Sequence, residues 1–164
     1  MSLTNDDLRT SADEPSEAVD AFGLEPGSGS SRTIRAPWHT SSVPLLRDAV
    51  SDDLRARGVK REVIDEAELV VSELVTNSLR HATPLTGDVV RVHWKARGDC
   101  VEVEVTDGGG ATEPRPVPEA AWRTSGRGLR IVRRLAHEWG VNRRDRQVTV
   151  WAALGGPSRR RVGG

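Results

Sequence analysis

The chain has 164 residues, which is enough for one domain with a tail. Its 24 basic and 24 acidic residues give a formal net charge of zero, which argues against direct binding of nucleic acid, because nucleic-acid-binding proteins usually carry a basic excess. The single cysteine, Cys100, excludes an internal disulfide and a thiolate metal cluster, and no apolar run is long enough to cross a bilayer. We therefore expect a cytoplasmic protein that binds no membrane.

The first part of the chain has the composition of a tail. Residues 1–31 are acidic and rich in Ser, Gly and Pro, with almost no regular spacing of apolar residues. Such a segment buries too little surface to offset the entropy of ordering, so we expect it to be disordered. Residues 155–164 are predicted to form a flexible C-terminal tail. The folded domain is therefore expected over residues 32–154.

Two helices are predicted after a short edge strand over residues 32–37. The first helix is expected over residues 43–57, with Ser41 or Ser42 as its N-cap. The second is expected over residues 61–81. Its apolar side chains recur at helical spacing, at Ile64, Ala67, Val71, Leu74, Val75 and Leu79.

The apolar pattern then changes to a period of two, which predicts a hairpin with strands over residues 90–95 and 101–106 and a turn at Gly98. The next segment, residues 107–125, has no periodicity and is rich in Gly, Pro and charge. It is too long for a simple connection, so we expect a functional loop or lid, or a disordered segment.

The last elements complete a two-layer arrangement. A third helix is expected over residues 128–137, and a closing hairpin over residues 139–143 and 147–154. The predicted order is helix, helix, hairpin, loop, helix, hairpin. It indicates an α+β fold, a two-layer α/β sandwich in which helices cover one face of a mixed, mostly antiparallel sheet.

Glu73 and Asn77 are the first candidate site residues. They are four residues apart in the second predicted helix, so their side chains lie on one face, beside the apolar stripe. An amide oxygen suits a hard cation such as Mg²⁺, and a carboxylate can accept a proton or orient a water molecule. This pairing suits a magnesium–phosphate site, although a solvated polar stripe explains the same spacing.

Asp107 is a second candidate. It follows a predicted buried strand and precedes three glycines, Gly108 to Gly110. A carboxylate at a strand end can accept a hydrogen bond from the exocyclic amine of adenine, and adjacent glycine lets the base approach the backbone. The alternative is a simple turn, because Asp-Gly commonly starts one.

The third candidate is Gly126-Arg127-Gly128-Leu129, where the long loop meets a helix. Glycines there free backbone N–H groups to face an anion, and the helix dipole favours negative charge at that end. Ser125 could cap the helix or contact a phosphate, and Arg127 could add positive charge. The Lys-Ser/Thr of a Walker A loop is missing. A flexible hinge is the alternative explanation.

Taken in order, these motifs resemble the N, G1 and G2 boxes of the Bergerat (GHKL, histidine kinase/Hsp90-like) ATPases. The matching residues are Glu73-x-x-x-Asn77, Asp107-x-Gly109 and Ser125-Gly126-x-Gly128-Leu129. The resemblance covers about residues 34–154. It is closest to the small anti-sigma-factor serine/threonine kinases of bacterial partner-switching systems, and it implies the Bergerat ATP-binding fold.

The resemblance implies ATP and Mg²⁺ as cofactors. Asn77 would bind the metal ion, and Glu73 would act as general base or would orient the attacking hydroxyl. Asp107 would bind adenine. The expected nucleotide-binding residues are Asn77, Asp107, Gly109, Ser125, Gly126, Arg127, Gly128, Leu129 and Thr149.

The resemblance also implies partners. The substrate would be a serine or threonine of a STAS-type anti-anti-sigma protein, so the nucleophile lies outside this chain, and a homodimer would bind a sigma factor. Thr124 stands where many relatives carry an acidic residue, and the loop before it is rich in proline. The alternative function is therefore an ATP- or ADP-gated partner-binding regulator with little or no kinase activity.

Overall fold

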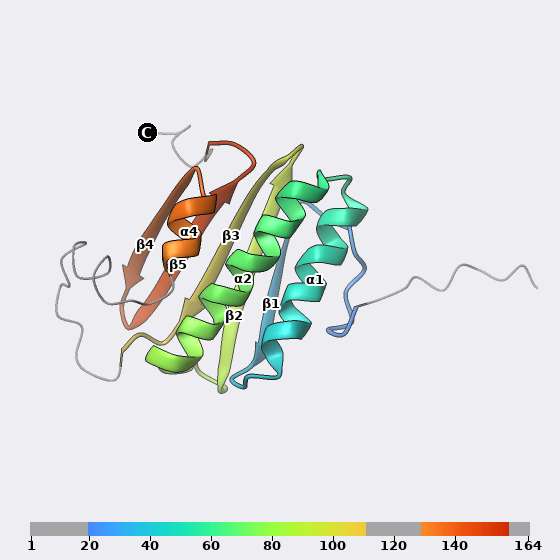
Figure 1. Cartoon of the computed structure of the whole chain (residues 1–164). Helices are drawn as coiled ribbons and strands as arrows, with labels where there is room; N and C mark the ends of the chain where they lie inside the picture. The colour runs from blue at the N-terminus through green and yellow to red at the C-terminus, as the bar shows by residue number, and fades with distance from the viewer. Residues whose placement is uncertain (1–19, 111–128, 158–164) are drawn as a thin grey trace, which may run out of the picture.

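The computed structural model describes residues 20–110 and 129–157 of the chain (Figure 1). Helices α1, α2 and α4 lie on one face of the sheet that the described strands form, which confirms the predicted two-layer α+β fold. The elements are β1 (Ser31–Pro37), α1 (Ser42–Ala56), α2 (Arg61–His81), β2 (Val89–Arg97), β3 (Cys100–Asp107), α4 (Leu129–Leu135), β4 (Glu138–Arg144) and β5 (Gln147–Leu154).

The described strands form one sheet with the order β1-β2-β3-β5-β4. Each neighbouring pair is antiparallel. Strand β1 is at one edge, as predicted, and it pairs with β2 after the chain has passed through α1 and α2. The β3–β5 pairing matters for the site, because its register determines which residues of β5 lie beside the end of β3.

Alternation in the strands and the apolar stripe of α2 define the core. On β2 the side chains of Val90, Val92 and Trp94 are buried beneath the helices, as the period of two predicts. Helix α2 has the predicted bounds, residues 61–81, and packs over β3 between α1 and α4. The helix has 21 residues, and burial of its apolar face against the sheet stabilises the helix layer.

Ser41 is the N-cap residue of α1, as predicted. Neither Ser41 nor Ser42, however, caps the helix with a side-chain hydrogen bond. The Ser42 hydroxyl donates instead to the carbonyl oxygen of Pro37 at 2.7 Å, and the Ser41 hydroxyl is hydrogen-bonded to Nδ1 of His39 at 2.7 Å. Both serine hydroxyls are hydrogen-bonded to residues of the preceding turn, and the Ser42 bond joins the start of α1 to the end of β1.

Helix α4 is shorter than predicted. It ends at Leu135, whereas the prediction extended it to residue 137. The N–H of His137 donates to the carbonyl oxygen of Ala153 at 2.8 Å, which places His137 beside the end of β5. Pairing with the sheet replaces the last helical turn there.

Residues 20–30 form a strap beside α1 (Figure 1). Phe22 and Leu24 pack against the core, and Asp20 Oδ1 accepts hydrogen bonds from both of their N–H groups, at 2.8 and 3.1 Å. The sequence predicted a disordered tail over residues 1–31. Residues 1–19 lie outside the described part of the chain. The strap contacts the domain through two apolar side chains and several backbone groups, and composition does not reveal these contacts.

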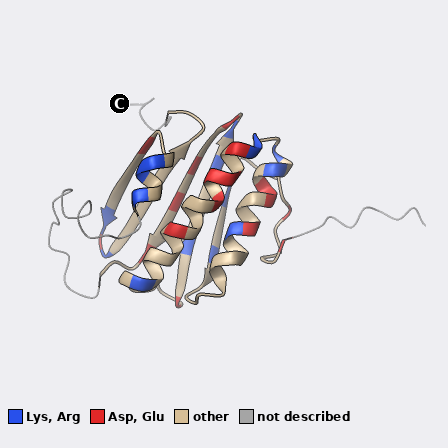
Figure 2. Ribbon diagram, viewed as in Figure 1, with Lys and Arg blue, Asp and Glu red and all other residues tan. Residues whose placement is uncertain are grey.

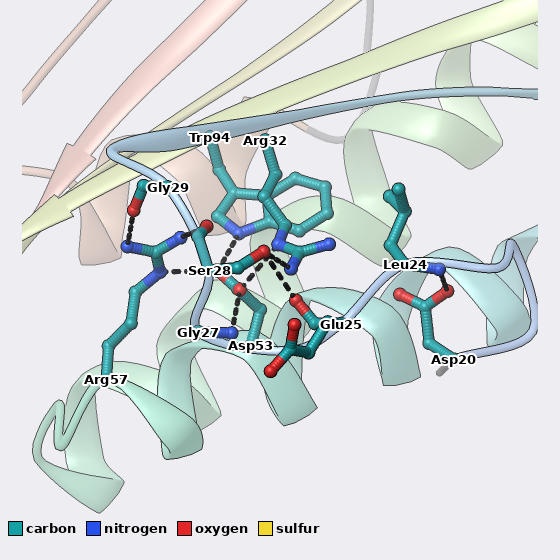
Figure 3. Close-up of polar contacts among 10 residues, drawn as sticks. All are labelled: Asp20, Leu24, Glu25, Gly27, Ser28, Gly29, Arg32, Asp53, Arg57 and Trp94. Atoms are coloured by element: carbon teal, nitrogen blue, oxygen red, sulfur yellow. Dashed lines mark hydrogen bonds and ion pairs between the residues drawn. The ribbon is translucent and has the colours of Figure 1, made fainter. Parts of the chain in front are cut away.

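Asp53 on α1 is the anchor of this strap (Figure 3). Its side chain is 1% exposed and accepts hydrogen bonds from Trp94 Nε1 and Arg57 Nε, each at 2.7 Å, and from the Gly27 N–H at 2.6 Å. Arg32 Nε lies 2.8 Å from Asp53 Oδ1 as an ion pair that lacks hydrogen-bond geometry. One carboxylate thus ties the strap, β1 and β2 to α1.

The surroundings of Asp53 favour its ionised form. Burial raises the pKa of Asp53, but hydrogen bonds from Arg57, Gly27 and Trp94, together with the charge of Arg57, lower it by more, so the net pKa lies below the ordinary 3.8. The Arg57 guanidinium also donates to the carbonyl oxygens of Gly29 and Ser28, both at 2.8 Å. The strap is therefore held by backbone as well as side-chain contacts.

Candidate nucleotide site

The candidate site lies where the C-terminal end of α2 meets the C-terminal end of β3 (Figure 1). Backbone bonds join the two segments that leave these ends. The Thr83 N–H donates to the Gly109 carbonyl oxygen at 2.8 Å, and the Gly108 N–H donates to the Thr83 carbonyl oxygen at 2.7 Å. The Thr83 hydroxyl adds a bond to Gly109 O at 3.0 Å. Residues far apart in sequence are thereby fixed at one corner of the sheet.

Asp107 is buried at this corner, with 7% of its surface exposed. Its Oδ2 accepts a hydrogen bond from the Ser78 hydroxyl at 2.6 Å, and its Oδ1 accepts one from the Gly109 N–H at 2.8 Å. Both donors hold the carboxylate in a defined orientation on the helix side of the sheet. Such a carboxylate can accept a hydrogen bond from an amino group of a ligand.

Two of the glycines after Asp107 are required by the local geometry. A Cβ on Gly108 would collide with the carbonyl oxygen of Pro84 and lie 2.9 Å from the Thr83 hydroxyl. Gly109 has φ +83°, and a Cβ there would lie 2.6 Å from the carbonyl oxygen of Arg146. Gly108 therefore allows the close approach of the segment after α2 to the end of β3, and Gly109 allows that of Arg146.

Glu73 and Asn77 are half-buried along α2, as predicted for a face beside the apolar stripe. His81, one turn further, is exposed. Figure 2 shows that acidic residues recur along α2, whereas the charged residues of α4 are basic. Glu73 thus belongs to a row of carboxylates that includes Glu62 and Glu66, and its place one turn before Asn77 sets it apart.

Thr149 does not share the Asp107 side of the sheet. Its hydroxyl is hydrogen-bonded to that of Thr106 at 2.8 Å, and Arg91 NH2 donates to the same Thr106 hydroxyl at 3.2 Å. Thr149 is paired with Thr106, while Val148 is paired with Asp107, so alternation directs Thr149 to the face that the helices leave uncovered. A nucleotide contact of Thr149, which the resemblance implies, would therefore not be a side-chain contact beside Asp107.

The glycine-rich motif is only partly described. Ser125, Gly126, Arg127 and Gly128 lie outside the described residues. Leu129, at the start of α4, is 5% exposed and belongs to the hydrophobic core. Its side chain packs inward, so a contact of Leu129 with a nucleotide would involve its backbone.

The family model of the histidine kinase-like ATPase domain matches residues 37–154, which include the corner at Asp107 and most of the described fold. The chain belongs to this family. The match confirms the relationship that the three motifs predict, and it spans the segment from the end of β1 to the end of β5.

This ATPase domain also resembles a solved structure, "the RsbU and RsbW domains of Rv1364c from Mycobacterium tuberculosis". The TM-score is 0.59 at 20% sequence identity, and the similarity covers 80% of this chain and 34% of that one. The chain thus spans about a third of the length of its structural neighbour, and the likeness establishes a shared fold. Among curated proteins, none matches the sequence significantly.

The donor set of the ATPase domain fits a magnesium ion that is held largely by its nucleotide. Within residues 20–110 and 129–157, no cluster of three or more His, Cys, Asp or Glu side chains could hold a metal by itself. Mg²⁺ in phosphate sites is usually bound by one or two side-chain oxygens, the substrate phosphates and water. The amide oxygen of Asn77, half-buried near Asp107, suits that role. In the same ranges, no helix is long and apolar enough to cross a membrane.

Two residues of the corner, Ser78 and Thr83, were not predicted as site residues. Ser78 could have been found, because it continues the buried stripe of α2 at Val71, Leu74 and Val75, where a hydroxyl needs a hydrogen-bond partner. Thr83 had no such signal. It follows the end of α2, and its role depends on the loop after β3.

Proposed function

We propose that the protein is an ATP-binding anti-sigma factor with serine/threonine kinase activity that phosphorylates a STAS-type anti-anti-sigma partner. The observation that carries the proposal is the buried Asp107 carboxylate, oriented by Ser78 and Gly109 at the corner that also receives the Asn77 end of α2. The family match supplies the ATPase context for that corner.

In this proposal Asp107 accepts a hydrogen bond from the exocyclic amine of adenine. Gly109 lies beside the base, and its backbone, with φ +83°, directs its N–H to Asp107 Oδ1. Ser125, Arg127 and the two glycines, Gly126 and Gly128, bind the phosphates through a hydroxyl, a positive charge and backbone N–H groups. These assignments place the base at the end of β3 and the phosphates toward the start of α4.

The phosphoryl transfer itself needs little covalent chemistry from this chain. When bound, Mg²⁺ supplies charge neutralisation on the phosphates, and Asn77 offers it an amide oxygen. Glu73 orients the partner's serine or threonine hydroxyl and accepts its proton as the oxygen bonds to the γ-phosphorus. The bond from that phosphorus to the β,γ-bridging oxygen breaks, and ADP leaves.

The proposal extends to partners. The likeness to a chain that contains an RsbW domain supports a place in partner switching, with a sigma factor as the second binding partner and a homodimer as the binding unit. If nucleotide controls partner binding without phosphoryl transfer, the protein is instead an ATP- or ADP-gated regulator. The two functions share the nucleotide site and differ in one measurable reaction.

The test is phosphorylation of a candidate STAS protein with γ-labelled ATP. Glu73→Ala should reduce transfer by about a hundredfold or more, within the range that general acid–base catalysis contributes, while ATP affinity remains within about threefold. Glu66→Ala is the matched control, because Glu66 is another half-buried carboxylate of α2, and it should leave transfer unchanged. Full transfer by Glu73→Ala rejects the assigned role. ATP-dependent partner binding without transfer by the wild type favours the gated regulator.

A further inference from the structure

The Ser78–Asp107 contact is a short hydrogen bond between two buried groups. The hydroxyl oxygen lies 2.6 Å from Asp107 Oδ2, and each residue is 7% exposed. Hydrogen bonds from a hydroxyl to a carboxylate are short and stronger than those between neutral groups. The contact also joins two layers, because Ser78 belongs to α2 and Asp107 ends β3.

Ser78 also occupies a special place relative to Asn77. Successive residues of a helix point about 100° apart. Asn77 therefore lies on the half-buried face that carries Glu73, while Ser78 lies on the face that contacts the end of β3. One turn of α2 thus contributes both to the phosphate end and to the base end of the candidate site.

We propose that Ser78 is a positioning residue that makes the site prefer a 6-amino purine over a 6-oxo purine; this inference rests on the proposed nucleotide-binding function. With its proton committed to Asp107, the Ser78 oxygen presents only acceptor lone pairs to other groups. The Asp107 carboxylate, held at Oδ1 by Gly109 and at Oδ2 by Ser78, is an oriented acceptor as well. An amino group at position 6 of a purine can donate a hydrogen bond to these acceptors. A carbonyl oxygen at the same position is itself an acceptor and is repelled.

A serine with a merely structural role makes a different prediction. Its loss would loosen the corner and weaken every purine nucleotide to the same degree. Loss of a positioning hydroxyl weakens ATP more than ITP, because only ATP depends on the orientation of the acceptor. The ratio of the two affinities therefore separates the two roles.

The experiment is calorimetric titration of the full chain with ATP and with ITP, both with Mg²⁺. For Ser78→Ala we expect about tenfold weaker ATP binding, little change in ITP binding, and so about a tenfold lower ATP:ITP affinity ratio, the loss typical of a hydrogen bond to a charged group. Ser72→Ala is the matched control. It removes from the same helix a buried hydroxyl, and that hydroxyl has no hydrogen-bond partner among the described residues. It should retain the wild-type ratio.

An unchanged ratio in Ser78→Ala, or equal weakening of both nucleotides, overturns the proposal. If thermal unfolding shows that Ser78→Ala does not fold, Ser78→Thr, which keeps the hydroxyl, decides: we expect a wild-type ratio, and a reduced ratio contradicts the proposal. Absence of any nucleotide binding by the wild type is a different failure. It rejects the nucleotide-binding function itself.

Discussion

Among the residues that the structure describes, two aspartates are buried, at opposite ends of the helix layer, and they differ in what surrounds them. Asp53 lies in the last part of α1 and interacts with two arginines, an indole and a backbone amide (Figure 3). Asp107 ends β3 beside the C-terminal part of α2 and accepts hydrogen bonds from a hydroxyl and a backbone amide. Burial of a carboxylate alone therefore does not identify a site; the kind of donor and the neighbouring motifs do.

The largest expected effect is on stability at the Asp53 end. Asp53→Asn leaves the charges of Arg32 and Arg57 without their counter-ion, so we expect the free energy of unfolding to fall by about 3–5 kcal/mol, measured by urea denaturation. Asp52→Asn, which breaks an exposed pair with Arg55, is the control and should cost less than about 1 kcal/mol. Equal losses in both variants would show that the Asp53 cluster is not an anchor.

The next effect is on nucleotide affinity at the Asp107 end. Asp107→Asn should weaken ATP binding by about 10- to 100-fold, because one hydrogen bond to a charged group is lost, while the unfolding free energy falls less than in Asp53→Asn. Calorimetry and urea denaturation of the same samples check both statements. If Asp107→Asn is less stable than Asp53→Asn and binds ATP like the wild type, the distinction between a structural Asp53 and a ligand-binding Asp107 is wrong.

A smaller loss of stability is expected at Gly108. In Gly108→Ala the new methyl group collides with the Pro84 carbonyl and crowds Thr83, so the bonds between the ends of α2 and β3 are strained. We expect a loss of about 1–3 kcal/mol in unfolding free energy. Gly110→Ala is the control, because its Cβ would meet no atom of the described residues within 4 Å, and it should change stability by less than about 0.5 kcal/mol. A stable Gly108→Ala would show that the corner is looser than described.

The smallest effect is the dependence of stability on pH. Because the folded-state pKa of Asp53 is below its ordinary value of 3.8, its ionisation stabilises the fold fully above about pH 4. This contribution is lost as the pH falls through the folded-state pKa. The difference in unfolding free energy between the wild type and Asp53→Asn should therefore shrink below about pH 4 and stay constant from pH 5 to 7, as urea denaturation at several pH values can measure. A constant difference down to pH 2 contradicts this assignment.

Long periodic segments were predictable from sequence, and contacts between distant segments were not. The bounds of α2 follow from an apolar stripe that extends from Ile64 to Leu79, and those of β2 from strict alternation. Nothing near Asp53 signals its bonds to Gly27 and Trp94, which lie 26 and 41 residues away. Isolated polar residues in a helix look alike in sequence until the fold selects their partners.

The candidate site shows the same division. The motifs identified Asp107 and the spacing of Glu73 and Asn77, because their residue types and order are distinctive. They could not show which hydroxyl orients Asp107, or that Thr149 is directed to the other face of the sheet. Those features depend on strand register and on the packing of α2 against β3.

The most direct test of the central claim is calorimetric titration with ATP and Mg²⁺ of the wild type, Asp107→Asn and Asp53→Asn, at a temperature at which all three are folded. We predict binding by the wild type, binding weakened at least tenfold in Asp107→Asn, and affinity within about threefold of the wild type in Asp53→Asn. No binding by the wild type, or equal binding by the wild type and Asp107→Asn, would contradict the assignment of the nucleotide site to the end of β3.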